Sequence, residues 1–223
     1  MCRLGAPIAV FADLPTCRMD TLLDISRPLS PATAVWPGDR PVEWSWTARK
    51  GKEMAVNVGA LATSTHAGTH ADAPLHVVSE GDSIDALPLS AFVGPAEVVA
   101  VDDDVIRPRH VPEVHAPRVL FRTAHSTVDA ETWMPDVAPL HPETVASLAD
   151  QGVVLVGTDA PSVDPVESKT LPAHHALIEA GIVNLENLAL GCVAPGCYEL
   201  IALPLAIVGA DASPVRAVLR DVR

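Results

Sequence analysis

Proline and glycine interrupt this sequence so often that they limit the length of its regular elements. The 223 residues include 21 prolines and 13 glycines. Proline removes a backbone donor and glycine adds backbone freedom, so both tend to end helices and strands. We see no internal repeat and no low-complexity linker. The chain is therefore expected to fold from many short elements joined by turns.

Short apolar runs between these breakers are typical of strands. Strands are expected over residues 22–25, 42–47, 55–63, 96–101, 119–123, 153–156 and 215–219. Helices are expected over 141–152 and over 173–180, because a proline opens the first and a glycine closes each. Strands and helices do not alternate regularly, which argues against a Rossmann fold. The predicted class is α/β, a mixed and strand-rich single domain.

Composition excludes several classes of function. Hydrophobic residues make up 48% of the chain and charged residues 19%, so a core is expected rather than disorder. The formal net charge of -13 repels phosphate backbones and anionic lipids, which argues against nucleic-acid and membrane partners. No apolar run reaches the roughly 20 residues that a membrane span needs. A small-molecule substrate is the expected partner.

The N-terminal segment is set apart from the rest of the sequence. Residues 1–18 are expected to be a disordered extension before a domain over 19–223. Their apolar stretch is weak for a signal peptide because Asp13 and Pro15 cut it short, although an export signal remains the alternative.

The four cysteines favour a reduced chain. Cys2, Cys17, Cys192 and Cys197 have neither CxxC nor zinc-finger spacing. A cytoplasmic location is the simplest interpretation. A disulfide between Cys192 and Cys197 stays open.

The segment from 64 to 76 concentrates metal-binding residue types. His66, His70, Asp72 and His76 fall within eleven residues, all at even positions. Even spacing on an extended chain sends side chains to one face. On a helix, Asp72 would point away from His66 and His70, and the intervening glycine and proline also oppose a helix. An extended or irregular backbone is therefore predicted.

Imidazole and carboxylate ligands together suit zinc, and they also accept manganese or cobalt. A carboxylate such as that of Asp72 adds charge and can bridge two ions. The competing interpretation is a chance cluster of surface histidines in a chain that has nine of them.

A second group of candidate ligands lies far downstream. His174 and Glu186 are twelve residues apart with Gly181 between them. Twelve helical residues rise about 18 Å, so the two cannot be neighbours on one helix. A helix ending at Gly181 and a returning segment would bring Glu186 back. Spacing alone leaves this half of the site open, and His175 competes with His174.

The run from His66 to His76 resembles the H-x-G-T-H-x-D-x-P-x-H signature of the cyclase-family metal-dependent hydrolases. Three further segments resemble the bacterial kynurenine formamidases (arylformamidases) within that family: Trp-Pro-Gly-Asp at 36–39, Ser-Lys-Thr-Leu-Pro-Ala-His-His at 168–175, and Leu-Glu-Asn-Leu at 185–188. The resemblance extends from about residue 20 to about residue 219, and the N-terminal extension departs from it.

The resemblance implies a swivelling β/β/α (cyclase-like) fold, usually as a homodimer or a higher homo-oligomer. It implies two zinc ions in each subunit, with Asp72 bridging them. The matching ligands are His66, His70 and Asp72 for one ion, and Asp72, His174 and Glu186 for the other.

The same resemblance assigns roles to two further residues. His76 matches the catalytic residue that transfers protons, and Trp36 matches a residue that contacts the substrate. For Trp36 the alternative is a tryptophan that pins the Pro-Gly turn.

Asp159, after an expected strand, would either line the site or cap a turn.

The implied reaction is hydrolysis of N-formyl-L-kynurenine to L-kynurenine and formate. Two rivals remain at this point. One is another cyclase-family hydrolase, such as an enzyme that opens the cyclic amide of isatin. The other is a non-catalytic metal-binding module.

Overall fold

The computed structural model describes residues 22–221, so the extension expected over 1–18 lies outside the described residues. A nine-stranded sheet forms the centre, in the order β1-β11-β9-β5-β6-β7-β8-β4-β10. The strands of this sheet are β1 (Leu22–Asp24), β4 (His70–Asp72), β5 (Val93–Ala100), β6 (Arg118–Arg122), β7 (Leu155–Thr158), β8 (Val183–Glu186), β9 (Gly196–Ile201), β10 (Ala212–Pro214) and β11 (Val218–Asp221). Strands β5 to β8 are parallel, and the other pairings are antiparallel. The mixed, strand-rich class predicted from the sequence is confirmed.

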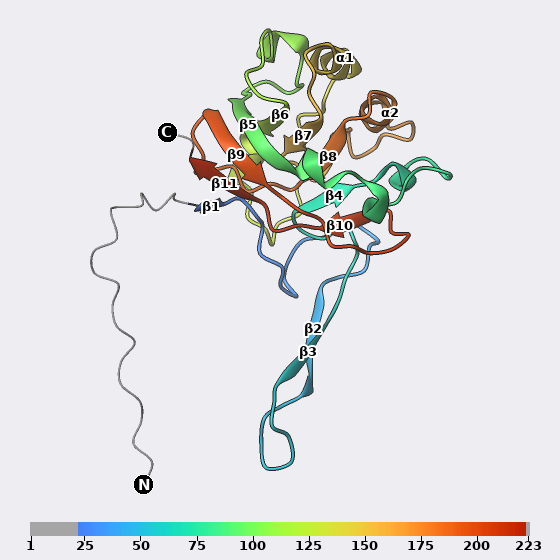
Figure 1. Cartoon of the computed structure of the whole chain (residues 1–223), viewed down its shortest axis with the longest axis vertical. Helices are drawn as coiled ribbons and strands as arrows, with labels where there is room; N and C mark the ends of the chain where they lie inside the picture. Colours follow the sequence, from blue (N-terminus) through green and yellow to red (C-terminus); the bar gives the residue numbers. More distant parts are fainter. Residues whose placement is uncertain (1–21, 222–223) are drawn as a thin grey trace, which may run out of the picture.

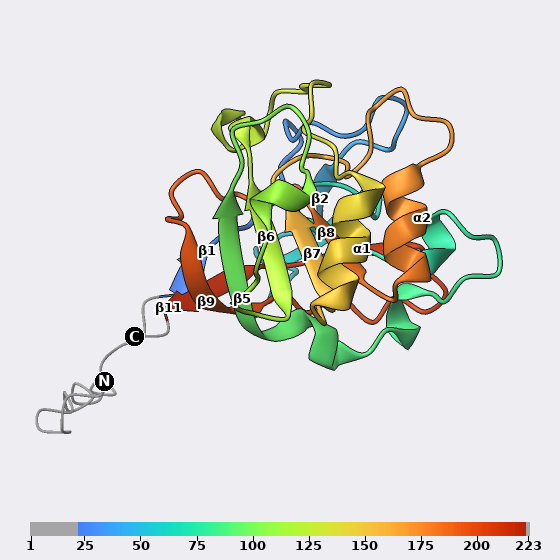
Figure 2. The same cartoon turned by 90° about the horizontal axis from the view of Figure 1, so that it is seen from above.

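Two helices lie side by side on one face of the sheet (Figure 2). They are α1 (Pro142–Asp150) and α2 (Pro172–Glu179), and each begins with a proline, where a missing backbone donor has no cost. The side chain of His141 accepts a hydrogen bond from the Glu143 backbone and caps α1. Both helices confirm the prediction, with ends within two residues.

Alternation along the central strands divides the core in two. In β6, Val119 and Phe121 pack in the cluster between the sheet and the helices, which also holds Leu148 and Leu177. Leu120, between them, belongs to the cluster on the opposite face. Each large apolar side chain buried in this way contributes about 1.5–3 kcal/mol. The parallel strands are therefore held from both sides, and they form a rigid base for the strands beside them.

The remaining strands, β2 (Glu43–Ala48) and β3 (Val58–Ala62), pair as a separate hairpin. The hairpin projects away from the body of the molecule (Figure 1). Its apolar side chains stay in solvent, with Trp44 52% and Leu61 55% exposed. Within residues 22–221, no helix is long and apolar enough to cross a membrane.

Candidate metal centre and active site

Strand β4 supplies the centre of the site. It has only three residues, His70–Asp72, and lies between β8 and β10. Alternation sends His70 and Asp72 to the same side of the sheet. Antiparallel pairing with β8 sets Glu186 opposite His70. The register of two short strands thus brings a distant carboxylate into contact with the histidine signature.

His66 lies in the turn that leads into β4. Gly68, two residues later, has a φ of 64°, and a Cβ there would lie 2.7 Å from Leu29 Cδ2. Glycine tolerates both the left-handed backbone and the close approach. The turn folds His66 back over the strand, so that its Nδ1 lies 3.1 Å from Asp72 Oδ1. The predicted irregular backbone is confirmed.

His174 enters from the first turn of α2. Its Nε2 lies 3.4 Å from Glu186 Oε1 and 3.7 Å from Asp72 Oδ2. The sequence did not decide whether a helix and a returning segment bring His174 and Glu186 together. The structure shows this arrangement, with α2 followed by β8. The neighbouring His175 is exposed.

Donor atoms gather in three groups among the described residues: two of them share Asp72, and the third joins Asp211 to His66 and His76. The donors of His66, His70 and Asp72 lie within 4.8 Å of one another, as do those of Asp72, His174 and Glu186. His70 Nε2 lies 3.4 Å from Asp72 Oδ1 and 3.5 Å from Glu186 Oε2. The Glu186 carboxylate, a member of one group that shares Asp72, therefore also faces a histidine of the other. The arrangement provides two adjacent positions for cations.

Two buried polar atoms that make no hydrogen bond, although oppositely charged groups lie close to both, fit a metal site. Among the described residues, His70 Nε2 and Asp72 Oδ1 are buried and make no hydrogen bond. Leaving such groups unpaired costs about 1–3 kcal/mol each, and more when they are charged. A divalent cation coordinated by these atoms would remove that cost, and the mixed imidazole and carboxylate set suits zinc.

The electrostatics of these side chains point the same way. Burial lowers the pKa of His70, but Asp72 and Glu186 outweigh it and raise that pKa to about 10. Burial raises the pKa of Asp72, yet His174, His66 and His70 hold it well below its usual range. The buried carboxylates therefore demand positive charge, which either protons on the histidines or a metal can supply.

Each candidate ligand histidine has an acceptor behind it. One ring nitrogen of each histidine faces the donor group, and the other nitrogen meets the acceptor. His70 Nδ1 lies 2.9 Å from the Gly68 carbonyl, and His174 Nδ1 lies 2.7 Å from Asp164 Oδ2. His66 Nε2 lies 3.0 Å from Asp211 Oδ2. Such outer partners fix the tautomer and orientation of metal-binding histidines.

Sequence reasoning missed both of these aspartates. Asp164 is buried and also accepts hydrogen bonds from the backbone of Ala173 and His174 at the start of α2. Isolated aspartates far from the signature carry no spacing signal, so only the folded chain reveals them.

His76 stands at the open side of the cluster. It ends a short 3-10 helix (Pro74–His76), and its ring centroid lies 4.2 Å from that of His66 and 5.8 Å from that of His174. Burial lowers the pKa of His76. A neutral imidazole at this position can accept a proton.

A cavity of about 540 Å³ opens over the cluster. Trp36 lines it and meets Trp133 edge to face, with ring centroids 5.1 Å apart. Trp133 and His125 also line the cavity, although the sequence did not indicate either of them. An aromatic wall facing ionisable groups forms a site suited to an aromatic substrate with a polar reacting group.

Asp159 does not line this cavity. It is fully buried and accepts hydrogen bonds from the backbone and hydroxyl of Thr123 and from Ser126 Oγ. Neither role considered from the sequence is observed: the carboxylate does not line the cavity, and it anchors the distant segment from Thr123 to Ser126 rather than its own turn. Cys192 and Cys197 are exposed free thiols, whereas the other two cysteines precede the described residues.

Comparison with known proteins agrees with this geometry. The profile of the cyclase family ("Putative cyclase") matches residues 23–165. The kynurenine formamidase of Salinibacter ruber is 59% identical over 206 residues, covering 90% of this chain and 97% of the relative. The chain belongs to the kynurenine formamidases of the cyclase family. The resemblance seen in the sequence is confirmed.

Two solved structures share the fold. A potential metal-dependent hydrolase with cyclase activity is 28% identical, with a TM-score of 0.78 over 91% of this chain and 98% of its own. Isatin hydrolase A from Labrenzia aggregata is 25% identical, with a TM-score of 0.80 over 91% of this chain and 94% of its own.

Proposed function

We propose that this chain hydrolyses N-formyl-L-kynurenine to L-kynurenine and formate. The observation that carries the proposal is the shared donor set, in which Asp72 and Glu186 each face two groups of histidines beneath an aromatic cavity. The identity of 59% to a kynurenine formamidase supports the substrate, whereas the isatin hydrolase is far less similar at 25%.

The metal centre is proposed to hold two zinc ions, with manganese or cobalt as substitutes. The residues that would hold them are His66, His70 and Asp72 for one ion, and Asp72, His174 and Glu186 for the other. When bound, the metal supplies Lewis-acid activation of the formyl carbonyl and of the attacking water.

The chain's own residues carry the proton transfers. Water adds to the formyl carbon, the bond from that carbon to the aryl nitrogen breaks, and the nitrogen needs a proton to leave. His76, at the cavity side of the cluster and close to both His66 and His174, is proposed to take the proton from water and deliver it to the nitrogen. Its neutral form is the form that this task requires.

Substrate binding is proposed to use the aromatic wall of the cavity. Trp36 and Trp133 pack edge to face and line the space above the cluster. A substrate ring beside Trp36 would gain about 0.5–1.5 kcal/mol beyond burial of its area. The wall would hold the formamide end over the metal centre.

We also infer that the chain forms a homodimer or a higher homo-oligomer. The β2–β3 hairpin extends from the body with Trp44 and Trp46 half-exposed, and such apolar surfaces usually mark interfaces. Sedimentation should show an assembly larger than one chain, and a Trp44→Ser, Trp46→Ser variant should shift towards monomer. A wild-type protein that sediments as a monomer at micromolar concentration would contradict this inference.

The proposed substrate can be tested directly on the purified protein. With zinc or manganese present, formate release from N-formyl-L-kynurenine should exceed ring opening of isatin at equal concentration. Faster isatin opening would replace the proposal with the isatin-type alternative, and no turnover of either substrate would favour a metal-binding module.

A further inference from the structure

Asp211 lies beside the histidine signature and lines the cavity, although neither that signature nor the second half-site includes it. It immediately precedes β10, whose antiparallel register sets Ala212 opposite Asp72. The backbone of Ala73 donates to the Asp211 carbonyl at 2.9 Å. Pairing with β4 therefore fixes Asp211 beside the strand that carries the central ligands.

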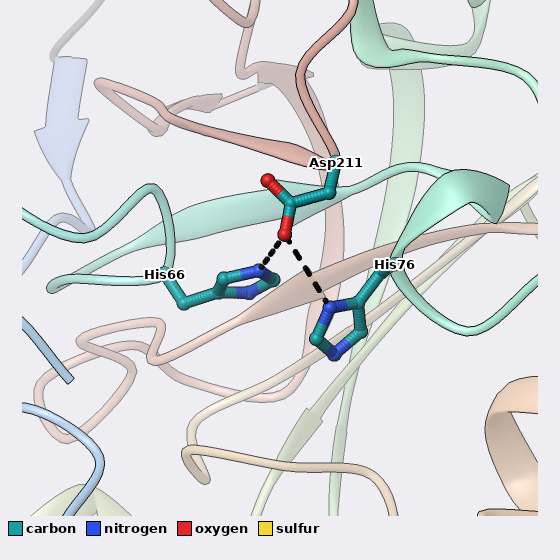
Figure 3. Close-up of side chains that lie close together, drawn as sticks. All are labelled: His66, His76 and Asp211. Carbon is teal, nitrogen blue, oxygen red and sulfur yellow. Dashed lines mark hydrogen bonds and ion pairs between the residues drawn. The ribbon is translucent and has the colours of Figure 1, made fainter. Parts of the chain in front are cut away.

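The carboxylate of Asp211 reaches two histidines with different tasks (Figure 3). Its Oδ2 lies 3.0 Å from His66 Nε2 and 3.7 Å from His76 Nδ1. Its Oδ1 accepts a hydrogen bond from Thr65 Oγ1 at 3.0 Å, which holds the carboxylate in place. One side chain thus contacts a candidate metal ligand and the candidate proton carrier.

The contact with His66 has a chemical consequence. When His66 Nε2 carries the hydrogen that is donated to Asp211, the lone pair of the neutral ring lies on Nδ1. That Nδ1 is the nitrogen that faces Asp72 Oδ1 at 3.1 Å. The Asp211 contact therefore selects the tautomer that can coordinate a metal, as Asp164 does for His174 through the opposite nitrogen.

We propose that Asp211 is a positioning residue that orients His66 for metal binding and holds His76 beside it. The expected effect of Asp211 on turnover rests on the proposed function. Its expected effect on metal binding does not depend on that function. Asp211 acts through the two histidines, and it contributes no ligand of its own.

The test compares Asp211→Ala and Asp211→Asn with the matched control Asp85→Asn in the full chain. Asp85 accepts a hydrogen bond from the backbone of Gly209, two residues before Asp211, but it is exposed and has no contact with the histidines. The same change of carboxylate to amide is thereby made at a residue that contacts the loop of Asp211 but lies away from the site.

Zinc affinity is measured by competition between metal-free protein and a chromophoric chelator, with bound zinc counted at saturation. Asp211→Ala should bind as many ions as the wild type, with about 10–100-fold lower affinity for one of them. Asp211→Asn should retain part of that affinity because its amide oxygen still accepts from His66. Asp85→Asn should match the wild type.

Kinetics separate the two contacts. With saturating zinc, the kcat of Asp211→Ala for N-formyl-L-kynurenine should stay below that of the wild type, because His76 is no longer held. The KM should be nearly unchanged. Full recovery of kcat at saturating zinc would overturn the role toward His76.

Three outcomes would overturn the role toward His66: unchanged zinc affinity in Asp211→Ala, the loss of one bound ion at saturation, or an equal loss of affinity in Asp85→Asn. If Asp211→Ala does not fold, the affinity of Asp211→Asn decides in the same way. Wild-type protein that binds zinc but does not turn over the substrate would refute the proposed function while leaving the affinity test intact.

Discussion

The buried floor of the site and its open rim are built differently. His70 and Glu186 face each other across two paired strands and are almost fully buried. His76 and Asp211, in contrast, lie outside the strands and face the cavity. Burial makes the floor dependent on a compensating cation, whereas the rim has access to water and substrate. The floor is therefore suited to holding metal and the rim to moving protons.

Removing a floor carboxylate should have the largest effect. Glu186→Ala takes away one member of the second donor group and leaves His70 and His174 without one of their charge partners. We expect loss of at least one bound metal ion in each chain and of nearly all turnover, measured by elemental analysis and formate release. An unchanged metal content would refute the two-metal arrangement.

Removing the rim imidazole should separate catalysis from metal binding. His76→Ala is expected to keep its metal and lose about 10²–10⁴-fold in kcat, the range typical of general acid–base residues. Elemental analysis and kinetics on the same preparation check both parts. Full activity in this variant would remove His76 from the mechanism and erase the distinction between floor and rim.

A smaller effect is expected from the acceptor behind His174. Asp164→Asn should weaken binding of one metal ion by about 10–100-fold without removing a ligand. The amide keeps one acceptor for the backbone at the start of α2, so the free energy of unfolding should fall by less than the roughly 1 kcal/mol of a lost cap. Chelator competition and urea denaturation measure these changes, and unchanged metal affinity would assign Asp164 to the helix alone.

The smallest effect is expected at the aromatic wall. Trp36→Ala should raise KM roughly two- to tenfold, the equivalent of a contact worth about 0.5–1.5 kcal/mol. Trp36→Phe keeps a ring and should recover most of the affinity. If Trp36→Ala lowers thermal stability and leaves KM unchanged, the tryptophan pins its turn and does not contact substrate.

Much of the site was predictable because its parts are local. His66, His70, Asp72 and His76 lie within one segment, and their spacing indicated an irregular backbone before any fold was known. The helices α1 and α2 were also predictable, since proline and glycine mark their ends.

The rest depends on pairings that local sequence does not encode. Strand β4 has three residues, too few to show an alternating pattern, and β8 was not anticipated as a strand. Without their register, nothing in the spacing places Glu186 opposite His70. Asp164 and Asp211 were missed because each acts through a contact across the fold.

Metal held on the buried floor is proposed to enable amide hydrolysis at the rim. The most direct measurement is formate release from N-formyl-L-kynurenine by chelated protein during stepwise return of zinc, with bound zinc counted at each step. Activity should be absent after chelation and should return with occupancy, reaching its maximum at two ions in each chain. Full turnover by the metal-free protein would contradict the account.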